Sequence, residues 1–140
     1  MMARYLFGVK RAGRRGANAV EFALTLPIFL TLMLGIMDYG YLMMAQAILD
    51  AAAMQGTREG AITDPNVASV VTTAENGARD VADFMCAGDC TYSCVDSGSP
   101  PAREVFCTLT WNIDPIVGLV PFPNSIGASG RQLLEWQRAR

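Results

Sequence analysis

Histidine is absent from this 140-residue chain, and lysine occurs once, at Lys10. The lack of histidine excludes a histidine general base, Ser-His and Cys-His nucleophile pairs, and zinc sites that contain histidine. The position of the single lysine near the amino terminus also argues against a Ser-Lys dyad. We therefore expect a protein that is not an enzyme, with no catalytic residues, no cofactor and no bound metal.

Negative charge is missing from residues 1–16, which contain five basic residues and no acid. Residues 17–140 carry thirteen acidic residues against six basic ones, a net charge of −7. This split suggests that the two parts sit in different compartments. The acidic excess argues against nucleic acid as a partner. Outside the basic leader and an apolar segment, fewer than a hundred residues remain, enough for one small soluble domain.

Charge of either sign is absent from residues 22–37, and the apolar run resumes after Asp38. A helix of roughly 20 residues crosses the hydrocarbon core of a bilayer, which is about 30 Å thick. We expect a transmembrane segment at about residues 22–42, surrounded by membrane lipid. Glu21 and Asp38 are separated by about 25 Å on a helix with a rise of about 1.5 Å per residue, so each can reach a headgroup region.

The basic leader also predicts the direction of insertion. By the positive-inside rule residues 1–16 stay in the cytoplasm, which places the larger part in the periplasm. A cleaved secretory signal is the alternative, and its apolar region would be about 7–15 residues long and end at small residues. The run here is longer, and residues 47–53 simply continue a helix. We therefore favour a retained single-pass anchor.

Glu21 stands alone at the start of the apolar run. A single carboxylate at the beginning of a lipid-facing helix costs free energy and so needs a functional reason. Gly16 lies between the basic leader and this glutamate, where it presents a cleavage site. Glu21 would be the fifth residue of the product.

Three blocks of sequence carry a family resemblance: GANAVEFALTLP at residues 16–27, LGIMDYG at residues 34–40, and AMQGTREGA at residues 53–61. Together they resemble the TadE-like family, the pseudopilins or minor pilins of tight-adherence (Flp-type, type IV-related) pilus systems. The resemblance covers about residues 16–61 and keeps the spacing between the blocks. It departs from the family at residues 55–57, Gln-Gly-Thr, where members usually have alanines.

The resemblance implies processing and a role in assembly. A prepilin peptidase would cut between Gly16 and Ala17, and Glu21 would pair with the amino-terminal amine of a neighbouring subunit. The implied partners are the prepilin peptidase, other pilin and pseudopilin subunits, and the inner-membrane assembly platform. The implied location is the bacterial inner membrane, single-pass, or an assembled extracellular pilus. The rival hypothesis is a static single-pass inner-membrane protein whose periplasmic domain binds an envelope partner.

The predicted fold class is α+β. It consists of a long amino-terminal helix over residues 17–61 that continues from the membrane into the periplasm, followed by a small periplasmic domain over residues 62–140. Asp64 followed by Pro65 is a helix start signal, and the apolar spacing after it predicts a second helix that ends near residues 84–88.

Alternation of side chains from Val105 to Trp111 predicts a strand. The turn signal at residues 98–101 precedes it, and residues 112–115 break it. Residues 115–123 contain three prolines and are expected to form a loop. Residues 125–136 suit either a strand or a short helix. A strand is favoured because the family tends to finish with one, although its two glycines weaken it.

Four cysteines follow the predicted second helix. An even number in an exported segment favours disulfides, while a site in which four thiolates hold a metal is the alternative. Four cysteines allow three connectivities. We favour Cys94–Cys107, because both lie equally far from the Pro-Pro turn and would face each other across a hairpin. Cys86–Cys90 would then remain, and it needs a bend at Gly88.

Overall fold

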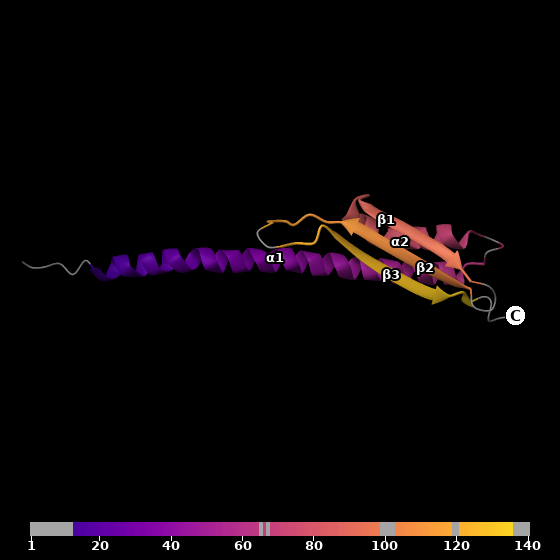
Figure 1. Ribbon diagram of the computed structural model, residues 1–140, viewed down its shortest axis with the longest axis horizontal. Helices are drawn as coiled ribbons and strands as arrows, with labels where there is room; N and C mark the ends of the chain where they lie inside the picture. Colours follow the sequence, from indigo (N-terminus) through magenta and orange to yellow (C-terminus); the bar gives the residue numbers. More distant parts are fainter. Residues whose placement is uncertain (1–12, 65, 67, 99–102, 119–120, 136–140) are drawn as a thin grey trace, which may run out of the picture.

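The computed structural model describes residues 13–64, 66, 68–98, 103–118 and 121–135. Along the chain these form α1 (Gly13–Ile62), α2 (Val70–Cys86), β1 (Cys90–Ser97), β2 (Glu104–Asn112) and β3 (Ser125–Leu133). Figure 1 shows a long rod, α1, with α2 and the sheet gathered on its carboxyl-terminal half. The predicted α+β class, with its long apolar first helix, is confirmed.

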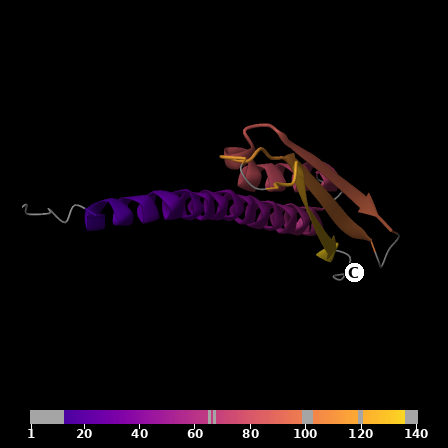
Figure 2. The ribbon, with the colours of Figure 1, turned by 60° about the vertical axis from the view of Figure 1, so that its left-hand side comes forward.

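Helix α1 has two halves with different surroundings. The first half stands free of the rest of the chain, and the second half packs on α2 and the sheet, as the rotated view in Figure 2 also shows. The helix ends at Ile62, one residue beyond the predicted end at residue 61. Its alanines favour the helical state and leave room for close packing.

Helix α2 starts later than the sequence pattern predicts. Its cap is Ser69, whose hydroxyl accepts a hydrogen bond from the Thr72 backbone N–H, and the helix begins at Val70. Asp64 instead closes a local turn, accepting from the Asn66 backbone N–H at 2.9 Å, so its carboxylate is not available as a helix cap. Pro65 lies outside the described residues. The predicted end near residues 84–88 is correct, because the helix stops at Cys86.

The sheet has three antiparallel strands in the order β1-β2-β3. It therefore contains the expected strand pair and adds the carboxyl-terminal strand that the sequence favoured only weakly. Gly130 lets β3 lie directly on α1, because a Cβ atom there would come within 2.5 Å of the Ala53 carbonyl oxygen. The glycine that weakens this strand is thus required where the strand crosses the helix.

The core lies between the two helices and one face of the sheet. The helices approach closely because small residues face one another. A Cβ atom at Gly56 would lie 2.6 Å from the Ala74 carbonyl oxygen, and one at Gly60 would lie 2.9 Å from the Ala74 side chain. Larger apolar side chains fill the space under the sheet; the largest that are fully buried are Leu49, Val105, Leu109 and Leu134.

Polar contacts fix the edges of this small domain. The Tyr92 hydroxyl on β1 donates to an Asp83 carboxylate oxygen on α2 at 2.8 Å. Burial and this hydrogen bond raise the pKa of Tyr92, while the Arg79 guanidinium over its ring acts in the opposite direction. An ion pair between Arg103 and Asp96 lies at the turn end of the β1-β2 hairpin.

Candidate membrane and assembly surface

The amino-terminal half of α1 presents an uninterrupted apolar surface. Within Asn18–Ile62, an 18-residue window has a mean hydropathy of 2.0 and no buried residue. Among the described residues this is the one helix long and apolar enough to span a membrane. A helix in the core of a soluble domain would bury such a surface, whereas here Phe22, Leu24 and Ile28 are each about two-thirds exposed.

Two of the residues singled out in the sequence lie at the start of this surface. Gly16 and Glu21 are both exposed and both belong to α1. The backbone of Ala17 is helical as well, so the predicted cleavage point falls within the first turns of α1. Residues 17 and 21 are one helical turn apart, about 6 Å along the axis. A new amine at residue 17 and the Glu21 carboxylate would therefore lie at the same end of the helix.

Asp38 is a functional candidate that the sequence reasoning missed. The sequence analysis placed Asp38 near a headgroup region, and in the structure its side chain is fully buried against the loop between β2 and β3. Its two carboxylate oxygens accept hydrogen bonds from the backbone N–H groups of Val117, at 2.9 Å, and Gly118, at 3.2 Å. Gly118 has a positive φ of 71°, which a glycine adopts without strain. The sequence signal for this residue was its position, since Asp38 is an acidic residue directly after the uncharged residues 22–37.

Further contacts fasten the same loop and β3 to α1. The Tyr39 hydroxyl donates to the Pro121 carbonyl oxygen at 3.4 Å, and Gln46 donates through its side-chain amide to the Gly127 carbonyl oxygen at 3.0 Å. The Tyr41 and Trp111 rings meet edge to face, 6.3 Å between centroids. The domain is therefore held to α1 from residue 38 onward and cannot swing freely about the end of the apolar run.

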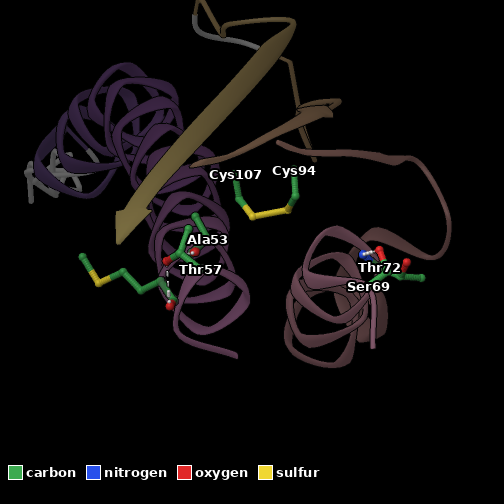
Figure 3. The surroundings of a disulfide bond; sticks show 7 residues. Ala53, Thr57, Ser69, Thr72, Cys94 and Cys107 are labelled. Atoms are coloured by element: carbon green, nitrogen blue, oxygen red, sulfur yellow. Dashed lines mark hydrogen bonds between the residues drawn. A yellow bond between two sulfur atoms is a disulfide. The ribbon is translucent and has the colours of Figure 1, made fainter. Parts of the chain in front are cut away.

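The structure brings together the cysteines that the sequence analysis paired. Cys94 and Cys107 lie directly opposite each other on β1 and β2, with Cα atoms 4.0 Å apart, and both are buried. Figure 3 shows their disulfide on the face of the sheet that is turned toward the two helices. Cys86 and Cys90 also form a disulfide, across the bend at Ala87 and Gly88, which both have positive φ. In the described part of the chain no three Cys, Asp or Glu residues gather as a metal site would require.

Comparison with known families identifies the amino-terminal segment. The family model described as TadE-like protein matches residues 16–58. These residues form a TadE-like domain. The match takes in Gly16, Glu21 and Asp38, all on α1, and it ends before α2. No curated protein and no solved structure matches the chain.

The TadE-like domain supports a role associated with the Tad pilus. The match stops within α1, so the second helix, the sheet and both disulfides lie outside it. The structure thus divides into an exposed TadE-like helix and a small domain that covers the last part of that helix. The family match includes both the exposed first half of the helix and residues such as Leu49 and Ala53 that the domain buries.

Proposed function

We propose that this protein is a minor pilin or pseudopilin of a tight-adherence pilus, with a structural and not an enzymatic role. It inserts in the inner membrane with the leader in the cytoplasm, is cut by a prepilin peptidase between Gly16 and Ala17, and joins other subunits through α1. The observation that carries the proposal is the TadE-like helix whose first half is apolar, exposed and headed by Glu21.

Glu21 supplies the specific contact in this assembly. Cleavage after Gly16 would create a positive amine at the end of an apolar helix, and Glu21 of a neighbouring subunit supplies the opposite charge. Between apolar helices the dielectric constant is low, so two opposite charges attract strongly, and each alone is costly. The pair therefore favours subunits in a fixed axial register over isolated helices.

The small domain has a supporting role. The hydrogen bonds from Val117 and Gly118 to Asp38 hold it on the second half of α1 and leave the first half uncovered. Two disulfides compensate for the limited apolar core of a domain that would work outside the cytoplasm. The domain would thus form the outward-facing part of a fibre whose shaft is made of packed helices.

The proposal is tested by assembly in the native host. Tagged protein carrying Glu21→Gln is compared with wild type for co-purification with the other pilus subunits after mild solubilisation. We expect both proteins to reach the membrane at similar levels, because removing a carboxylate from lipid does not impede insertion. We expect the amount of co-purified subunit to fall at least several-fold for the variant.

Asp50→Asn is the matched control. Asp50 is an exposed acid on the same helix, beyond the apolar run, and its removal changes the net charge by the same amount. It should leave co-purification at the wild-type level. Undiminished assembly with Glu21→Gln would contradict the pairing role. Failure of wild type to associate with any pilus subunit would contradict the proposed function and favour the static anchor.

A further inference from the structure

The loop between β2 and β3 lies beside the end of the apolar run of α1. Its flanking segments extend beyond the sheet toward the amino-terminal half of α1 (Figure 1), and Asp38 and Tyr39 hold it there by hydrogen bonds to Val117, Gly118 and Pro121. The chain carries no charged residue between Asp114 and Arg131. This loop is therefore an uncharged segment fixed at one level along the helix.

The length of the apolar run sets that level relative to the bilayer. The rise from Glu21 to Asp38 is about 25 Å at about 1.5 Å per residue. The hydrocarbon core is about 30 Å thick, so with Glu21 at one boundary Asp38 lies about 5 Å inside the other. A carboxylate at that depth is costly without partners, and here the side chain is fully buried and both oxygens accept backbone hydrogen bonds.

The side chains on the outside of the loop suit the same depth. Ile116 is 60% exposed and Val117 is 37% exposed, beside Tyr39, which is 44% exposed. Exposed aliphatic groups next to a tyrosine at the end of a spanning helix are typical of the boundary between hydrocarbon and headgroups. A hydrated position would leave these apolar groups in water without any compensating contact.

From this geometry we infer that the loop around Ile116 and Val117 is a second membrane contact, which enters the outer leaflet next to α1 and fixes the height of the domain above the bilayer. The inference rests on the membrane anchoring of the proposed function. This surface of the loop contacts lipid. Acyl chains pack against the aliphatic side chains, while the loop itself shields Asp38 from the lipid. The small domain is then attached to the membrane at two points and not by the helix alone.

The test measures the depth of a spin label in the full chain, reconstituted in vesicles of phosphatidylethanolamine and phosphatidylglycerol. With the four native cysteines paired, Ile116→Cys offers one reactive thiol, and its 60% exposure means that the substitution leaves the core intact. Ile36→Cys, 69% exposed on the apolar run, is the lipid control, and Asn76→Cys, exposed on α2, is the water control. Collision with oxygen reports lipid, and collision with a water-soluble nickel chelate reports water.

We expect the ratio of oxygen to nickel collisions at residue 116 to approach that at residue 36 and to exceed that at residue 76 several-fold. A ratio at residue 116 like that at residue 76 would overturn the inference and leave the proposed function standing. Protection from both reagents would also overturn it, because it indicates a contact with a second protein chain. An aqueous ratio at residue 36 would overturn both this inference and the membrane span on which it rests.

Discussion

Replacing Gly56 with alanine tests whether close contact between α1 and α2 limits the stability of the domain. A Cβ atom at this position would lie 2.6 Å from the Ala74 carbonyl oxygen and 2.9 Å from the Ala78 Cβ atom. Ordinary contacts begin near 3.4 Å. Because one obstacle is backbone and the other is the first side-chain atom, rotamer changes do not relieve the clash, and α2 must move away by several tenths of an ångström.

The expected loss follows from two opposing effects. Overpacking a well-filled core costs about 1–3 kcal/mol. Alanine gains up to about 1 kcal/mol over glycine in a helix interior. With the full helical gain subtracted, the net loss is up to about 2 kcal/mol, and for a domain of this size each kcal/mol lowers the melting temperature by about 4–8 °C.

The assay is thermal unfolding in detergent micelles, followed through the near-ultraviolet signal of the aromatic core. Gly40→Ala is the matched control, since it makes the same change on the same helix where an added Cβ meets nothing within 4 Å. That variant should match or slightly exceed wild type in stability. If Gly56→Ala melts at or above the temperature of Gly40→Ala, the packing argument for this helix pair is wrong.

Three other variants probe separate parts of the structure. Asp38→Asn should lower the free energy of unfolding by about 1–3 kcal/mol, because the new amide NH₂ group cannot accept a hydrogen bond from the backbone N–H that faces it. The loop should also become more sensitive to protease. Replacing Cys94 and Cys107 with serine should cost about 3 kcal/mol, as expected for a bond closing a loop of roughly 14 residues, whereas unchanged urea stability would argue against that bond. The pKa of Tyr92 is raised in the folded state, so its protonated hydroxyl stabilises the fold below the ordinary pKa of about 10, and this stabilisation is lost as pH rises through the higher folded-state pKa. The free energy of unfolding of wild type should therefore fall at alkaline pH, and Tyr92→Phe should reduce that fall.

The features that the sequence predicted correctly are those governed by short-range periodicity. Side chains on a strand alternate with period two, so equal distances from the Pro-Pro turn were enough to place Cys94 opposite Cys107. Likewise, the apolar helical spacing predicted that the second helix ends near residues 84–88, and α2 ends at Cys86. In both cases the determining residues lie within about a dozen positions of one another.

The features that were missed depend on distant or competing contacts. Asp38 binds backbone groups 79 and 80 residues away, in a loop with no periodic pattern, so nothing near it in the sequence marks its partner. Asp64 and Ser69 are both good capping residues, and only the structure shows that Asp64 is used in a turn. Gly56 has a low intrinsic helix propensity, and only the structure shows that its lack of a side chain is what lets α2 approach.

The amino terminus of the protein made in its native host tests the central claim most directly. The proposed function requires a prepilin peptidase to cut after Gly16, and intact-mass measurement with amino-terminal sequencing reads the result. We predict a mature chain that starts at Ala17, and a Gly16→Val variant that stays in the membrane as uncut precursor. A wild-type chain that retains residues 1–16 while the same cells process their other prepilins would contradict the assignment as a pseudopilin.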